Sequence, residues 1–93
     1  MIETLRVHED ELRAAGVVHL SVFGSVARGD ASERSDVDLM ADFDKSKHLT
    51  LVKVGSLQQC MSEWLGAEVE LWSADWMREP VRSRAIREAV VAF

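Results

Sequence analysis

The sequence predicts an α/β (α+β) fold, in which helices pack on a small mixed β-sheet. Three features carry this prediction: short apolar runs rich in β-branched residues, strict alternation in the middle of the chain, and helical periodicity around them. The 93 residues contain no linker, repeat or low-complexity stretch. We therefore expect a single domain over residues 1–93, with its elements in the order helix, strand, turn, strand, helix, strand, helix.

The first half of the chain predicts a helix followed by two strands. Residues 1–15 have near-helical apolar spacing that ends at Gly16, and residues 17–23 form a short β-rich run typical of a buried strand. Residues 24–34 are polar and contain glycine, which predicts a loop. Residues 36–43 alternate between apolar and mainly acidic side chains. One face is expected to lie in the core and carries Val37, Leu39, Ala41 and Phe43. The other is expected to be solvated and acidic and carries Asp36, Asp38, Met40 and Asp42.

The second half predicts a helix, a strand and a last helix. Residues 49–65 follow a helical period closed by Gly66, with Val52 and Trp64 on the apolar face and Cys60 buried. Residues 68–72 alternate again, and Ser73 is a suitable N-cap for a short turn. Pro80 favours the start of a helix that continues to about Ala92.

Composition narrows the class of protein. The net charge of −5 argues against direct DNA binding, which needs a basic face, and is compatible with carboxylates gathered around metal ions. One cysteine excludes an internal disulfide and a cysteine-cluster zinc site. No apolar run approaches the roughly 20 residues that span a bilayer, and the N-terminus lacks the pattern of a signal peptide. We expect a cytoplasmic protein with no membrane partner.

Asp36 and Asp38 are the first candidates for chemistry. Two residues apart on a strand, their Cα atoms lie about 6.6 Å apart on one face. Two such charges roughly 5 Å apart repel by about 3 kcal/mol at an effective dielectric of 20, a cost that a bound cation offsets. Oxygen ligands suit magnesium. The alternative is a solvated edge strand, because Asp-x-Asp pairs are common.

The loop before this pair favours a metal site over a solvated edge strand. Gly24 and Ser25 directly follow a predicted strand, where a glycine lets the backbone approach phosphate oxygens and the serine hydroxyl can bind them. Ten residues separate Ser25 from Asp36, enough to place a phosphate cradle opposite the carboxylates. The second Gly-Ser pair, Gly55 and Ser56, lies within a helical pattern and has no acidic pair downstream at that spacing.

The segment GSVARGDASERSDVDL resembles the Gly-Ser-x10-Asp-x-Asp signature of polymerase-β-like nucleotidyltransferases, and the short chain resembles their minimal nucleotidyltransferase (MNT) branch. The resemblance implies a third carboxylate on the strand after the middle helix. The matching residue is Glu70, where the family usually has aspartate, and Glu68 on the same face is a rival. It also implies a phosphate-neutralising role for Arg28, whose alternative is a surface pair with Asp30 or Glu33.

By this resemblance the chain transfers AMP from ATP with two Mg²⁺ ions, or Mn²⁺, held by Asp36, Asp38 and Glu70, while Gly24 and Ser25 anchor the phosphates. MNT domains are typically paired with a HEPN-domain toxin, which they neutralise by attaching AMP to a tyrosine. The resemblance therefore implies an antitoxin enzyme in a hetero-oligomer. The alternative is a weak or inactive MNT fold that neutralises its partner by binding alone, which the glutamate at position 70 keeps open.

Other polar and aromatic residues are expected to be structural. His19 alternates with core residues and is expected in the core, and His8 has no partner at ligand spacing. Trp72 shares the face of Glu70 and is expected to pack in the core or an interface, with contact to a nucleotide base as the alternative. The arginines of the last segment are expected on a solvated helix face, with partner docking as the alternative: Arg78, Arg82, Arg84 and Arg87.

Overall fold

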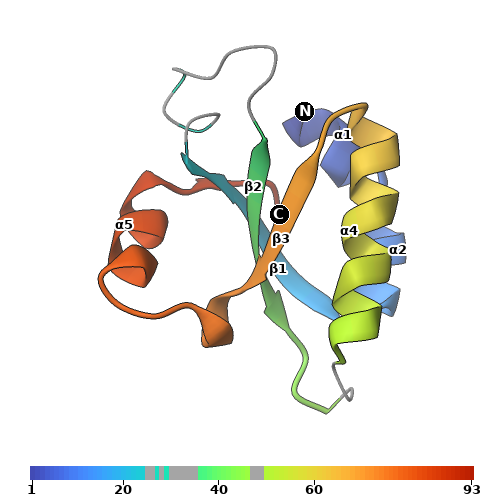
Figure 1. The fold of residues 1–93 in the computed structure, drawn as a ribbon. Helices are drawn as coiled ribbons and strands as arrows, with labels where there is room; N and C mark the ends of the chain where they lie inside the picture. Colours follow the sequence, from blue (N-terminus) through green and yellow to red (C-terminus); the bar gives the residue numbers. More distant parts are fainter. Residues whose placement is uncertain (25–26, 28, 30–35, 47–49) are drawn as a thin grey trace.

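The computed structural model describes residues 1–24, 27, 29, 36–46 and 50–93. Its centre is a mixed four-stranded sheet with the strand order β3-β2-β1-β4 (Figure 1). The α/β fold expected from the sequence is confirmed. The strands span Val17–Phe23 (β1), Val37–Phe43 (β2), Val69–Ser73 (β3) and Val90–Val91 (β4).

Helices lie on both sides of this sheet. α1, α2 and α4 lie on one side and α5 on the other (Figure 1). The helices span Ile2–Val7 (α1), Glu9–Ala14 (α2), Leu51–Leu65 (α4) and Val81–Glu88 (α5), and a 3₁₀ turn, η1, spans Ala74–Trp76. Within the described ranges, no helix combines the length and the apolar character needed to cross a membrane.

The central strand pairs set the geometry of the sheet. β1 is antiparallel to both β2 and β4, whereas β2 and β3 are parallel. A parallel pair needs a long connection, which α4 provides between β2 and β3. Thr50 caps the start of α4, and its Oγ1 accepts a hydrogen bond from the Lys53 N–H at 3.1 Å. Gly66, in the left-handed conformation, closes the helix as the sequence predicts.

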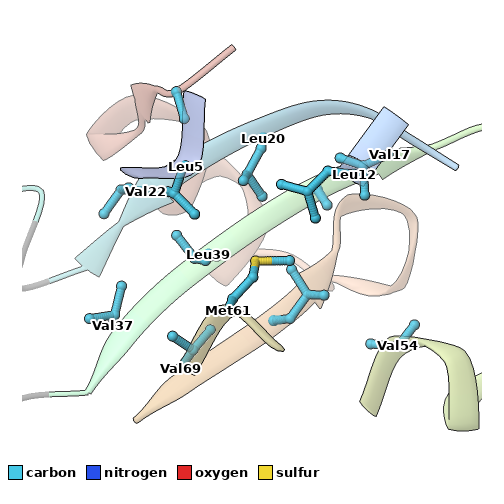
Figure 2. Packing of buried hydrophobic residues seen from close by; sticks show 13 residues of the cluster. Leu5, Leu12, Val17, Leu20, Val22, Val37, Leu39, Val54, Met61 and Val69 are labelled. Atoms are coloured by element: carbon cyan, nitrogen blue, oxygen red, sulfur yellow. The ribbon is translucent and has the colours of Figure 1, made fainter. Parts of the chain in front are cut away.

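The core fills the space between the sheet and the three helices α1, α2 and α4. Met61 of α4 reaches toward Leu39 of β2 and Val69 of β3, and Leu5 and Leu12 bring α1 and α2 against β1 (Figure 2). Leu39 and Met61 are fully buried. The alternation predicted for residues 36–43 and 68–72 is confirmed at Val37, Leu39, Ala41, Val69 and Leu71, which all face this core.

A second, smaller apolar cluster lies on the opposite side of the sheet. Phe23 of β1, Met77 just after η1, and Ala85 of α5 are buried together, and Met40 of β2 packs against them. The prediction of a wholly wet face on β2 is therefore wrong at Met40. Met40 therefore separates Asp38 from the exposed Asp42 further along the same face of β2.

Two helices differ from the prediction, and the structure contains one strand that was not predicted. The N-terminal helix is interrupted at His8, whose ring stacks on half-buried Trp64 at 3.7 Å between centroids, so His8 joins α1 and α2 to α4. The last helix ends at Glu88 rather than near Ala92. Val90 and Val91 instead form β4 and pair with Val22 and Ser21.

Three side chains expected inside are exposed. His19 follows a β-bulge between Val17 and His19, which shifts the register of β1 and places this residue opposite Asp42 at the surface. Cys60 and Val52 lie on the outer face of α4, where Val52 is 80% exposed. The buried side of α4 is instead defined by Val54 and Met61.

The outer edge of β3 is capped by side chains of α4. The backbone N–H of Val69 donates to Ser62 Oγ at 3.0 Å, and that of Leu71 donates to Gln58 Oε1 at 2.9 Å. Edge strands otherwise present unpaired donors that can pair with another chain. Helix α4 therefore both connects the parallel strands and closes this edge.

We expect Gln58→Ala to lower the free energy of unfolding by about 1–2 kcal/mol, because the N–H of buried Leu71 loses its acceptor. Urea titration monitored by circular dichroism measures the change. Gln59→Ala is the matched control, since exposed Gln59 bonds to Glu63 on the same helix at 3.3 Å, and should change stability by less than about 0.5 kcal/mol. Equal effects of the two substitutions would contradict the capping role.

Candidate active site

The end of β1 brings Gly24 into contact with Asp38 of β2. Phe23 is the register partner of Asp38, so the chain leaves β1 directly beside this carboxylate. Gly24 has φ +75°, and a Cβ added at this position would lie 2.5 Å from Asp38 Oδ2. Only glycine leaves room for the carboxylate here, and only glycine adopts this φ without strain. The backbone of Gly24, the first residue of the Gly-Ser motif, thus lies against Asp38 of the Asp-x-Asp motif.

The parallel register places Glu70 beside Asp38. Asp38 pairs with Glu70 and Val37 with Val69, and Val37 N–H donates to the Glu68 carbonyl at 2.8 Å. Val37 and Val69 face the core, so Asp38 and Glu70 lie together on the opposite face. Glu70 is exposed, as is Glu68 just before β3. Of these two glutamates, Glu70 is the register neighbour of Asp38.

A pocket of about 320 Å³ opens where Gly24 and Asp38 meet α5. Arg84 brings a positive charge to this pocket. The sequence predicts Arg84 only on a solvated helix face, together with the other arginines of the last segment. The available signal was the concentration of four arginines in residues 78–87, but the helical period alone did not show which of them faces β2. The lining residues are Phe23, Gly24, Asp38, Val81, Arg84, Ala85 and Glu88.

Asp36 and Glu70 line a second hollow, of about 640 Å³, between β3 and α4, together with Glu68 and Gln58. Within the described part of the chain, no three His, Cys, Asp or Glu side chains lie close enough to hold one metal ion. The three predicted ligands therefore do not form a closed cage here. The all-oxygen set still fits magnesium, which takes one or two carboxylates and completes its shell with water and substrate phosphate.

Two predicted site residues, Ser25 and Arg28, lie outside the described residues. Their assignments remain predictions. The adjoining Gly24 fixes where the loop leaves β1, which is at the mouth of the Asp38 pocket.

Comparisons of the sequence with a family model and with characterised relatives point to the same family. Residues 5–92 match the nucleotidyltransferase domain family. The chain is 36% identical over 87 residues to the protein adenylyltransferase MntA of Thermococcus cleftensis, a match that covers 92% of this chain and 86% of the relative. Its sequence similarity therefore extends over nearly the whole length of both chains.

Solved structures share the fold. A minimal nucleotidyltransferase is 34% identical, with a TM-score of 0.73 over 96% of this chain and 93% of the other. A toxin–antitoxin structure with AMP-PNP gives 0.79 at 16% identity, over 97% and 72% of the two chains. A complex of tri-AMPylated HEPN toxin of Shewanella oneidensis with its MNT antitoxin gives 0.71 at 14% identity, over 100% and 72%. At these lower identities the likeness is one of fold.

Proposed function

Because the chain belongs to the nucleotidyltransferase domain family, we propose that it transfers AMP from ATP to a tyrosine hydroxyl of a HEPN-type toxin and thereby acts as its antitoxin. The observation that supports this proposal is the contact between Gly24 and Asp38, since Gly24 is the proposed phosphate-binding glycine and Asp38 a proposed metal ligand. The proposed reaction takes place in the cytoplasm.

In this proposal the residues divide into two groups around the nucleotide. Gly24 and Ser25 bind the β- and γ-phosphates, and Arg28 and Arg84 neutralise their charge. Asp36, Asp38 and Glu70 would hold two Mg²⁺ ions, which supply electrostatic stabilisation of the transferred phosphoryl group and lower the pKa of the attacking hydroxyl.

The bond changes follow from an in-line displacement. The acceptor oxygen forms a bond to the α-phosphorus while the bond from that phosphorus to the bridging oxygen breaks, and pyrophosphate leaves. The hydroxyl proton passes to a carboxylate of the acidic group, for which Glu70 is the proposed acceptor because it is exposed beside Asp38.

The activities named for relatives of this chain are the reason for proposing a protein as the acceptor. The Thermococcus cleftensis relative is a protein adenylyltransferase, and a structural neighbour is an MNT antitoxin bound to an AMPylated HEPN toxin. An acceptor hydroxyl must be held about 3–3.5 Å from the α-phosphorus, and a docked partner can supply that positioning.

Transfer of label from α-labelled ATP tests the proposal. With magnesium and a HEPN-domain partner, label should move onto the partner, and mass spectrometry should locate AMP on a tyrosine. A partner that binds and is neutralised without receiving label would instead identify an antitoxin that acts by binding alone. Chelation of the divalent metal should stop transfer, and undiminished transfer in excess chelator would contradict the metal-dependent mechanism.

We expect Glu70→Gln to lower the rate of transfer by about 10²- to 10³-fold while changing ATP affinity less than threefold, the pattern of an interaction made mainly in the transition state. Glu68→Gln is the control, because Glu68 is exposed and precedes the register pair of Asp38. Single-turnover kinetics with labelled ATP separate the two effects. Equal losses in the two variants would leave Glu70 without its assigned role.

A further inference from the structure

Two tryptophans are exposed on the active-site side of the sheet. Trp72 of β3 is 43% exposed and Trp76 of η1 is 50% exposed. Trp72 follows Glu70 on the same strand face, and its register partner is Met40, two residues beyond Asp38. Large exposed aromatic side chains grouped in this way are typical of protein interfaces, where tryptophan is enriched among the residues that contribute most to binding.

These tryptophans form a groove that meets the catalytic pocket. The groove has a volume of about 320 Å³. Val81, which is 53% exposed, lines both this groove and the pocket that contains Gly24 and Asp38. A chain lying in the groove would therefore reach the catalytic pocket past Val81. The groove is lined by Trp72, Trp76, Met77, Arg78, Glu79 and Val81.

The segment that enters the groove and continues through α5 has a charge opposite to that of the chain as a whole. The chain carries a net charge of −5, yet residues 78–87 contain four arginines and one acidic residue, Glu79. The Glu79 carboxylate accepts a hydrogen bond from the Ser83 hydroxyl. In the described ranges, none of the four arginines forms an ion pair. An apolar groove with Arg78 in its lining and Arg82 one helical turn further on complements a partner surface that combines acidic and apolar side chains.

We propose that the tryptophan groove, defined by Trp72, Trp76, Met77 and Val81, is the docking surface for the acceptor protein. Its occupant is an acidic segment of that protein with an apolar side chain seated between the tryptophans. Docking there presents a neighbouring hydroxyl to the Asp38 pocket. This inference rests on the proposed function for the identity of the partner, but it concerns a surface separate from the nucleotide-binding residues.

The test uses the HEPN-domain protein that is offered as acceptor in the transfer assay, whether or not it receives AMP there. Trp72→Thr, which keeps a good strand former, and Trp76→Ala should together weaken its binding by at least about 30-fold in calorimetry without nucleotide. Affinity for magnesium-ATP should stay within twofold. Val7→Ala with Val52→Ala is the matched control, since both valines are 80% exposed and lie outside the groove; this pair should leave both affinities unchanged.

A second arm tests the charge. Arg78→Glu with Arg82→Glu should weaken partner binding about 10-fold or more, and the salt dependence of that binding should become shallower. Neither arginine lines the Asp38 pocket, so magnesium-ATP affinity should not change.

The outcomes separate this inference from the proposed function. Native partner affinity in the tryptophan variant overturns the docking surface even if AMP transfer proceeds. A complex that forms natively, weakens in the variant and receives no AMP supports the surface and overturns the transfer reaction. If the native chain forms no complex with the partner, both are wrong.

Discussion

Replacing Gly24 by alanine is expected to reduce nucleotidyl transfer by about 10²- to 10³-fold, because the new methyl group occupies the position of the Asp38 carboxylate. The added Cβ would lie 2.5 Å from Asp38 Oδ2, so the carboxylate must move by about an ångström. A displacement of that size at a reacting centre can cost about 10² in rate. The φ of +75° adds about 1–2 kcal/mol of backbone strain for any residue with a Cβ.

The strain and the clash can be separated by a matched substitution. Gly66 also has a left-handed φ, +64°, but an added Cβ there would meet nothing within 4 Å. Gly66→Ala should therefore lose about 1–2 kcal/mol of stability, as Gly24→Ala does, and keep its transfer rate. Thermal unfolding and initial rates of labelled transfer measure the two quantities. Comparable losses of activity in both variants would show that the Gly24–Asp38 contact has no special role.

The second large effect is expected for Asp38→Asn, which should lower the transfer rate by about 10³-fold or more, equivalent to roughly 4 kcal/mol of transition-state stabilisation. The substitution preserves the shape of the side chain. It removes the negative charge that would hold the metal ion next to the nucleotide phosphates. Asp38 also lines the pocket between Gly24 and α5, so no other carboxylate of β2 can replace it. Combining it with Asp36→Asn should abolish magnesium-dependent ATP binding in calorimetry.

Asp42→Asn provides the control, because Asp42 is an exposed carboxylate on the same strand, opposite His19 at the other end. It should change the rate less than twofold. The single variant Asp36→Asn is informative in its own right, since Asp36 lines the hollow with Glu68 and Glu70. A large loss of transfer in that variant would show that Asp36 joins Asp38 at the nucleotide. Magnesium-ATP affinity undiminished in the double variant would exclude both as ligands.

The central part of the fold was predictable from the sequence because its signals are local. Strict alternation in residues 36–43 and 68–72 fixes which side of β2 and β3 is buried, and Gly66 fixes the end of α4. The same alternation placed Asp38 and Glu70 on the faces of their strands that point away from the core, but it did not show that they are neighbours, which depends on the parallel register of β2 and β3. Gly24 could be proposed as an anchor from its place after β1, but its contact with Asp38 depends on the antiparallel pairing of β1 and β2.

Other features could not be predicted because they depend on distant parts of the chain. A two-residue strand has no periodicity, so Val90 and Val91 read as the end of a helix until their pairing with β1 is known. The bulge in β1 reverses the side on which His19 lies, and sequence alternation does not reveal an inserted residue. Arg84 joins the site only because α5 packs over Phe23, which is a tertiary contact.

The pairing of β4 with β1 has a consequence for how the protein folds. Val22 contacts Val90, so this sheet edge closes a loop containing most of the chain, whereas β1 pairs with β2 within a much shorter segment. Pairings between distant residues form late because the entropy of loop closure is lost before their contacts are gained. The pocket takes Gly24 and Asp38 from the early part of the chain and Val81 and Arg84 from α5. A growing or refolding chain would therefore hold its acidic motif in place before it has a closed pocket, and it would gain activity only when residues 81–91 dock.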